Sequence, residues 1–141
     1  MIVIDTSAWI EYFNDTGHEV VNDIEYALDN ELICLGDLIY CEVLQGIKQK
    51  REVNKVKNVF NTLHKEIIGG FEICEKASEN YKYLRSLGVT MRKTIDEIIG
   101  TFCLENGYEI IHNDSYFRYM ETHLGLKLFK PHNTHSRLFT L

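Results

Sequence analysis

Short apolar runs alternate along this chain with longer segments in which apolar residues recur at helical spacing. Unbroken apolar runs are typical of strands that are buried on both faces of a parallel sheet. Crossover connections between parallel strands place helices on those faces. The pattern therefore predicts an α/β fold of three layers (α/β/α), with a central, mostly parallel sheet. The predicted strands are Ile2–Ile4, Leu32–Leu35 and Glu109–His112, with Ile67–Ile68 and Lys127–Phe129 as further strand candidates.

Helices are expected between and beyond these strands. Gly88 and Gly107 each stand where a predicted helix should end. Asp37 is expected to cap the helix that begins there, and Thr94 with Glu97 three residues later has the pattern of a capping box. The expected helices are Ser7–Phe13, Glu19–Asp29, Asp37–Ile47, Glu52–Lys65, Glu72–Leu87, a segment from Thr94 that ends before Gly107, and Ser115–His123.

Length and composition favour one globular domain. The chain has 141 residues, enough to bury a core, and lacks a Gly/Ser-rich linker, so residues 1–141 are expected to form a single domain. Although 45% of the residues are hydrophobic, no stretch approaches the roughly 20 apolar residues of a membrane span. The sequence shows neither a secretion signal at its N-terminus nor a C-x-x-C pair among its four cysteines. We therefore expect a cytoplasmic protein with reduced, buried thiols.

The formal net charge of −6 disfavours a classical sequence-specific DNA-binding protein, since such proteins are usually basic. It is compatible with an enzyme that acts on nucleic acid, because divalent cations held by acidic residues reverse the sign of the local field. The placement of the acidic residues along the chain therefore bears directly on function.

Two acids follow predicted strands. Asp5 comes directly after the strand Ile2–Ile4, and Asp114 comes two residues after the strand that ends at His112. The carboxyl ends of parallel strands lie along one edge of a sheet, where α/β proteins bind ligands. An Asp at the start of a helix can also simply cap it, which stabilises the helix by about 1 kcal/mol. Both interpretations stay open for each acid.

Asp96 and Glu42 are two further acids in unusual surroundings. Asp96 lies in the first turn of its predicted helix beside the apolar Ile95 and Ile99, although the helix dipole alone would favour an acid there. Glu42 lies in the segment D-L-I-Y-C-E-V-L, which is apolar on most sides of a helix. A carboxylate buried in such a helix needs a cation, a donor or a proton, whereas a solvent-facing Glu42 needs none of these.

Four carboxylates brought together would repel one another unless cations neutralise them. Ligation by oxygen alone suits Mg²⁺ or Mn²⁺ rather than zinc, and such sites hydrolyse phosphodiesters by activating a water and stabilising the leaving oxygen. Thr6 and Ser7 could hold a metal-bound water or a phosphate, or could simply cap a helix. We call the four acids the acidic quartet: Asp5, Glu42, Asp96 and Asp114.

With these residues the sequence resembles PIN-domain proteins, and in particular the VapC ribonuclease toxins of bacterial and archaeal toxin–antitoxin pairs. The opening I-V-I-D-T-S-A-W-I-E is similar to the family's apolar strand followed by D-T/S-S and a helix. Y-C-E-V-L-Q-G resembles the family segment in which a Glu is followed by apolar residues and a Gly. The stretch from G-V-T-M-R-K-T-I-D to H-N-D-S-Y-F resembles the C-terminal signature. The likeness covers essentially the whole chain and keeps these segments in order.

The resemblance implies a PIN-like fold and an endoribonuclease that uses Mg²⁺ or Mn²⁺. It implies that the acidic quartet provides the metal ligands and catalytic residues, with Thr6, Ser7 and Asn113 in support. It also implies an RNA substrate, often a structured RNA such as tRNA, a homodimer, and a small cognate antitoxin that blocks the site. Gly100, where the family usually has alanine, and Glu97, an extra acid, are small departures that remove no ligand.

Basic side chains would be needed near the quartet to bind RNA phosphates. Two groups of basic residues lie close in sequence to quartet members, and each could equally be a solvated surface. They are Lys48, Lys50 and Arg51 after the helix of Glu42, and Arg92 and Lys93 before Asp96.

Two other classes of function are less well supported. An acid after the first strand also marks aspartyl-phosphate phosphatases and receiver domains, but these usually carry a second acid nearby, where Thr6 and Ser7 stand here. A non-catalytic PIN-fold binding module would be favoured by the loss of a quartet acid, and none is lost. His132 and His135 have a spacing that could bind a metal, although a polar C-terminal tail is the favoured interpretation.

Overall fold

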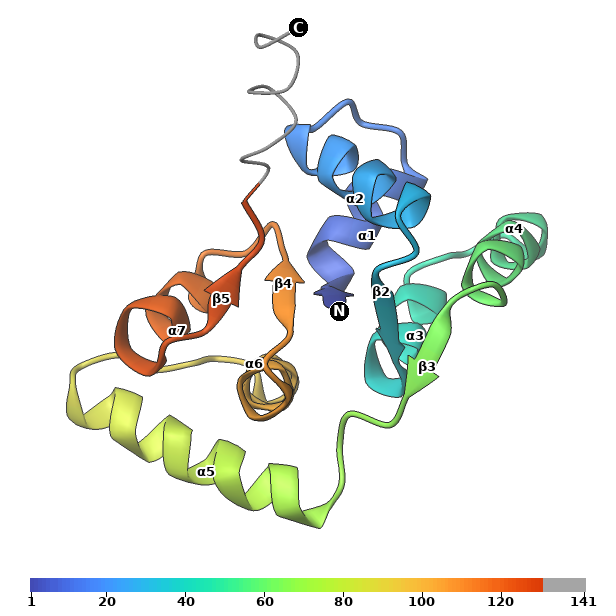
Figure 1. The fold of residues 1–141 in the computed structure, drawn as a ribbon. Helices are drawn as coiled ribbons and strands as arrows, with labels where there is room; N and C mark the ends of the chain where they lie inside the picture. Colours follow the sequence, from blue (N-terminus) through green and yellow to red (C-terminus); the bar gives the residue numbers. More distant parts are fainter. Residues whose placement is uncertain (131–141) are drawn as a thin grey trace, which may run out of the picture.

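The computed structural model describes residues 1–130 and contains a five-stranded sheet in the order β3-β2-β1-β4-β5 (Figure 1). All four strand pairs are parallel. The predicted α/β fold with a mostly parallel sheet is therefore confirmed, whereas His132 and His135 lie outside the described residues. The strands are β1 (Ile2–Ile4), β2 (Ile33–Gly36), β3 (His64–Glu66), β4 (Glu109–Ile111) and β5 (Lys127–Leu128).

Helices cover both faces of the sheet. On one face α1 packs against α2 and α3, and on the other α5, α6 and α7 pack against one another (Figure 1). Within residues 1–130, no helix combines the length and apolar character that a membrane span requires. The helices are α1 (Thr6–Phe13), α2 (Glu19–Asp29), α3 (Asp37–Gln45), α4 (Lys50–Phe60), α5 (Phe71–Ser86), α6 (Thr94–Asn106) and α7 (Tyr116–Leu124).

The strand order explains why the helices fall into two layers. From β1 the chain steps outward to β2 and β3, and it then returns to the other side of β1 to form β4 and β5. Because parallel crossovers are right-handed, a reversal of direction moves the following helices to the opposite face. The reversal lies between β1 and β4, and the carboxyl ends of these two strands form the crevice in which doubly wound folds bind ligands.

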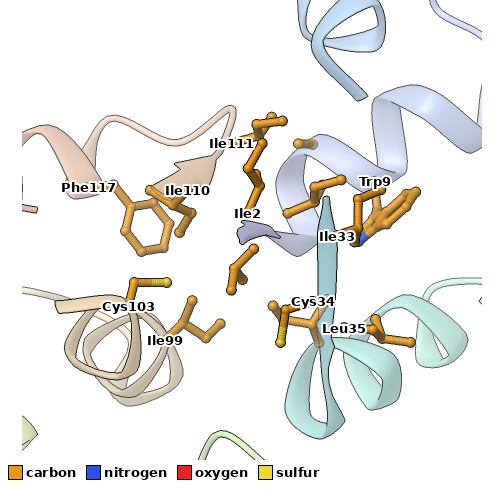
Figure 2. Close-up of a cluster of buried hydrophobic side chains, with 14 of the residues drawn as sticks. Ile2, Trp9, Ile33, Cys34, Leu35, Ile99, Cys103, Ile110, Ile111 and Phe117 are labelled. Atoms are coloured by element: carbon orange, nitrogen blue, oxygen red, sulfur yellow. The ribbon is translucent and has the colours of Figure 1, made fainter. Parts of the chain in front are cut away.

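The core lies on both sides of the central strands (Figure 2). Every residue of β1 is buried, which accounts for the unbroken apolar run at the start of the chain. Trp9 packs edge-to-face on Phe60 with ring centroids 5.0 Å apart, on the side of the sheet covered by α1. Ile99 and Phe117 fill the opposite side, from α6 and α7 (Figure 2). Burial at this scale supplies most of the stabilisation of such a fold.

One predicted helix extends too far. The helix expected over Glu52–Lys65 ends at Phe60, and residues His64–Glu66 form the edge strand β3 rather than a helical turn. Hydrogen bonding to β2, with Cys34 opposite His64, determines this conformation. The strand expected at Ile67–Ile68 therefore lies just beyond the real one.

Two predicted helix caps are also wrong. The Asp37 carboxylate accepts a hydrogen bond from the backbone N–H of Ile68 at 2.9 Å, so it joins distant segments instead of capping α3. Thr94 is the first residue of α6 rather than its cap. Glu97 is buried, and within residues 1–130 neither of its carboxylate oxygens has a hydrogen-bond partner, so the capping box does not form. Packing of α6 against α5 has overridden the local pattern.

Gly100 marks a close approach of two helices. A Cβ at this position would collide with the Sδ and Cε atoms of Met120 in α7. The glycine that departs from the usual alanine of the family is therefore matched by a large side chain on the facing helix.

Candidate active site

Asp5 stands at the carboxyl end of β1, where its backbone N–H donates to the carbonyl of Ile111 at 2.9 Å. One carboxylate oxygen, Oδ2, accepts hydrogen bonds from the N–H and the hydroxyl of Ser7 at 3.2 and 2.7 Å. Asp5 therefore caps α1. Its other oxygen, Oδ1, is buried and has no hydrogen-bond partner within residues 1–130. Capping thus uses only half of this carboxylate.

Ser7 joins the ends of the two central strands. Its hydroxyl donates to Asp5 and accepts from the backbone N–H of Asn113 at 2.9 Å. Asp114 follows, and its Oδ1 accepts from the N–H of Tyr116 at 3.1 Å at the start of α7. Asp5 and Asp114 therefore lie at neighbouring strand ends, as their positions in the sequence predicted.

Glu42 is held by a hydrogen bond from α1. The hydroxyl of Thr6 donates to Oε1 of Glu42 at 2.8 Å, across the contact between α1 and α3. Glu42 is half-buried, so it is neither a core residue nor a freely solvated one. Thr6 orients the carboxylate towards the carboxyl edge of the sheet instead of capping α1.

Asp96, in the first turn of α6, links the quartet electrostatically. Its side chain is only 5% exposed, and within the described part of the chain its Oδ2 has no hydrogen-bond partner. Burial raises the pKa of Asp96 to about 7, and the negative charges of the other three quartet members add to this effect. Burial also raises the pKa of Asp5, against the hydrogen bonds from Ser7. The structure thus brings all four acids close enough to influence one another.

The quartet remains more widely spread than a second cluster of possible ligands. Within residues 1–130, the only group of three or more Cys, His, Asp or Glu side chains whose ligand atoms all lie within 4.8 Å of one another is Cys34, His64 and Glu66. The two buried oxygens of Asp5 and Asp96 still fit a hard divalent cation, which prefers carboxylate oxygens and would supply their missing partner.

The two basic groups lie differently with respect to the quartet. Lys93 lies close enough to Asp96 to oppose the rise in its pKa, and its neighbour Arg92 is exposed. The other group is exposed and lies at the start of α4 and just before it. Within it, Nε of Arg51 lies 3.9 Å from Oε1 of Glu52. That group consists of Lys48, Lys50 and Arg51.

Three residues beside the quartet were not predicted. The first is Glu11, one helical turn after Ser7, whose Oε1 accepts a hydrogen bond from the side-chain amide of Asn113 at 3.4 Å. The second is His112, whose Nδ1 accepts a hydrogen bond from the backbone N–H of Asp114 at 3.0 Å. The third is Arg118, which lines a hollow of about 400 Å³ together with His112 and Asp114. Helical spacing from Ser7 and Asp114 was the signal that could have identified Glu11 and Arg118.

A family model described as PIN domain matches residues 2–122. This chain belongs to the PIN-domain family. The resemblance inferred from the sequence motifs is thereby confirmed, and the chain segments carrying the quartet all fall inside the matched region.

Relatives of this PIN domain include proteins named as ribonucleases. VapC ribonuclease Mb1587 of Mycobacterium bovis and Ribonuclease VapC11 of Mycobacterium tuberculosis are each 29% identical to it over 119 residues, which is 83% of this chain and 89% of the relative.

Solved structures share the fold of this PIN domain. VapBC2 from Rickettsia felis, bound to a promoter DNA fragment, matches with a TM-score of 0.70 at 16% identity over 92% of this chain and 98% of the other. VapBC from Salmonella typhimurium, also bound to DNA, matches with a TM-score of 0.72 at 16% identity over 91% and 96%. VapC20 of Mycobacterium tuberculosis, described as a Sarcin-Ricin loop cleaving toxin, matches with a TM-score of 0.64 at 12% identity over 93% and 100%.

Proposed function

We propose that this protein is a VapC-type endoribonuclease toxin that hydrolyses RNA phosphodiester bonds at the acidic quartet with bound Mg²⁺ or Mn²⁺. The observation that carries the proposal is the pair of buried oxygens on Asp5 and Asp96, which lack partners within residues 1–130 and lie among further carboxylates. Such atoms are costly to bury, and a divalent cation offsets that cost. A protein that served only to dock a partner would gain nothing from them.

Each residue has a distinct part in this proposal. Asp5 and Asp96 provide the two unpartnered oxygens as ligands, while Thr6 holds the third ligand, Glu42. Ser7 orients Asp5 and fixes the strand end that carries Asp114. When bound, the cation supplies activation of a water and stabilisation of the leaving oxygen.

Asn113 and the basic residues complete the proposed site. Asn113 holds the β4 end against Ser7 and Glu11. Lys93 and its neighbour Arg92 would contact RNA phosphates close to the quartet, where the positive charge of Lys93 already acts on Asp96. The RNA would also contact a second basic group, farther from the quartet, which consists of Lys48, Lys50 and Arg51. A structured RNA such as tRNA is the proposed substrate class.

We further propose a small cognate antitoxin, a homodimer and a single domain over residues 1–141. Two of the structural neighbours are VapBC complexes, which supports a partner of the antitoxin type. The proposal of a homodimer rests on the resemblance to the family, and light scattering on the purified protein would test it directly.

The decisive experiment compares the partner-free protein with Asp96→Asn on total RNA and on tRNA, in Mg²⁺, in Mn²⁺ and in EDTA. We expect discrete products that disappear with EDTA and with the substitution, because Asn removes ligand charge at nearly constant volume. Asp29→Asn is the control, since Asp29 is an acid at the end of α2 that belongs neither to the quartet nor to the hollow lined by Asp114. Equal RNA cleavage by wild type and Asp96→Asn, or none by either alongside unaltered RNA binding, would favour the binding-module alternative.

A further inference from the structure

A second group of metal-binding side chains lies on the β2–β3 edge of the sheet, away from the quartet. Cys34 of β2 pairs in register with His64 of β3, and Glu66 follows two residues later on the same strand. Since side chains alternate along a strand, His64 and Glu66 lie on one face. Figure 2 shows Cys34 on the side of the sheet that carries Ile99 and Cys103 of α6. We call these three residues the Cys–His–Glu cluster: Cys34, His64 and Glu66.

The ligand atoms of this cluster converge closely. The Cys34 Sγ lies 3.1 Å from Oε2 of Glu66, and Nε2 of His64 lies 3.1 Å from the same oxygen. All three ligand atoms lie within 4.8 Å of one another. In a tetrahedral zinc site, bonds of about 2.0–2.3 Å place neighbouring ligand atoms about 3.3–3.6 Å apart. The two distances to Oε2 of Glu66 are therefore within a few tenths of an ångström of that geometry.

The donor set differs in kind from the quartet. A thiolate and an imidazole are soft or borderline ligands that select zinc and similar transition metals over magnesium. One Cys, one His and one Glu amount to three protein ligands, and zinc sites with three protein ligands leave a fourth position for water or another group. Tyr108 donates its hydroxyl to Oε2 of Glu66 at 2.9 Å, as outer-shell residues that orient metal-bound carboxylates do.

We propose that Cys34, His64 and Glu66 bind a Zn²⁺-class transition-metal ion at the β2–β3 edge, in a site separate from the acidic quartet. The inference does not depend on the proposed ribonuclease function. An ion can reach the site from solvent, because the side chain of His64 is 55% exposed and that of Glu66 is 28% exposed. Cys34 closes the inner side of the site, since it is only 1% exposed.

Metal binding at the cluster releases a proton from the Cys34 thiol. The hydrogen bond from the Cys34 thiol lowers the pKa of Glu66, so this carboxylate is already anionic at neutral pH. Burial, with the adjacent Glu66, raises the pKa of the Cys34 thiol to about 12. The thiol therefore gives up one proton to solvent when its sulfur binds the ion. Binding should accordingly weaken as the pH falls.

A purely structural role predicts different behaviour. In that case Glu66 would accept hydrogen bonds from Cys34 and Tyr108 and interact with His64, and the three would need no ion. Substitution of His64 would then leave metal affinity unchanged, because only the surface contact with Glu66 would be lost. The two interpretations are therefore separable by metal binding itself, without any measure of RNA cleavage.

The experiment is a Co²⁺ titration of the full-length, reduced and chelator-treated protein, followed by Zn²⁺ competition and calorimetry. We expect one ion per chain that gives the near-ultraviolet absorption of a thiolate–cobalt bond, apart from any ion bound at the quartet. Cys34→Ser should abolish that absorption, and His64→Gln should weaken Zn²⁺ binding by at least about 100-fold, since loss of an outer-shell partner alone costs about 10–100-fold. Tyr108→Phe should weaken it by about tenfold.

Matched controls separate this cluster from other donors. Cys74→Ser removes an exposed thiol on α5, and a His132→Gln/His135→Gln double variant removes the other histidine pair singled out in the sequence. Asp96→Asn tests the quartet. All three should keep the full thiolate–cobalt absorption. Absence of that absorption in the wild type, its persistence in Cys34→Ser, unchanged Zn²⁺ affinity in folded His64→Gln, or loss of the absorption in any control would each overturn the proposal.

Discussion

The acidic quartet and the Cys–His–Glu cluster sit on the same sheet but are assembled in opposite ways. The quartet draws its members from the ends of β1 and β4 and from α3 and α6, so distant segments bring like charges together. The cluster comes from two paired strands, and its groups interact with one another. Within residues 1–130, two quartet members keep buried oxygens without partners, whereas no cluster atom does. The quartet is thus a gathering of like charges, whereas the cluster combines three different donor types.

The largest effect that tests this contrast is a crossed loss of function. Asp5→Asn should reduce RNA cleavage at least about 100-fold, because a metal ligand supplies several kcal/mol of transition-state stabilisation. It should leave Zn²⁺ binding at the cluster unchanged. Cys34→Ser should show the reverse pattern when both cleavage in Mg²⁺ and Zn²⁺ affinity are measured. If either substitution impaired both properties in a folded protein, the two sites would not be independent.

The next effect is a pH dependence of stability that originates beside the quartet. Burial raises the pKa of Asp96 and Glu97 to about 7 in the fold, above their ordinary values of 3.8 and 4.5. The folded state then binds more protons than the unfolded state between about pH 4 and 7. Without divalent cations, stability should therefore rise as the pH falls from 8 to 5, by roughly 2–3 kcal/mol for each of the two groups.

Urea unfolding of the wild type and of variants measures this dependence. Asp96→Asn should flatten the pH profile, since it removes one of the two groups, and Cys34→Ser should preserve it. Added Mg²⁺ should stabilise the protein more at pH 8 than at pH 5, because protonated carboxylates bind cations poorly. Equal or lower stability of the metal-free wild type at pH 5 would contradict the assignment.

A smaller effect concerns the contact that supports α6. Gly100→Ala should lower the free energy of unfolding by about 1–3 kcal/mol, because the new methyl group meets Met120 in a packed core. Thermal or urea unfolding measures the change. Since α6 carries Asp96 but no residue of the cluster, RNA cleavage should decline while Zn²⁺ binding stays intact. A gain in stability, as helix propensity alone predicts, would show that the two helices can separate without cost.

The fold was largely predictable because its strongest signals are local. The apolar run Ile2–Ile4 and the glycines at positions 88 and 107 correctly marked a central strand and two helix ends. The edge strand His64–Glu66 was missed because its residues are polar and follow an amphipathic helix without a break in pattern. Only its register with β2 determines its conformation, and register is a long-range property.

The acidic quartet could be predicted from the sequence and the Cys–His–Glu cluster could not, because only the quartet is marked by local signals. Quartet members follow strand ends or begin helices, so topology alone predicted that Asp5 and Asp114 would lie close together. The capping box predicted at Thr94 does not form because Glu97 is buried and lines a pocket together with residues of α5. A four-residue pattern carries no information about that long-range contact. Cys34 and His64 could not be linked from sequence, since the segment with His64 was predicted to be helical.

The placement of β1 has a consequence for the timing of activity during synthesis. Its neighbour β4 is made last among the inner strands, and the bond between Ser7 and Asn113 spans 106 residues. A chain still on the ribosome cannot bring Asp5 and Asp114 together until β4 has emerged and paired with β1. Nascent fragments therefore lack the complete quartet. If the protein cleaves RNA, the ribosome that makes it is protected from each new copy until β4 has emerged and paired with β1.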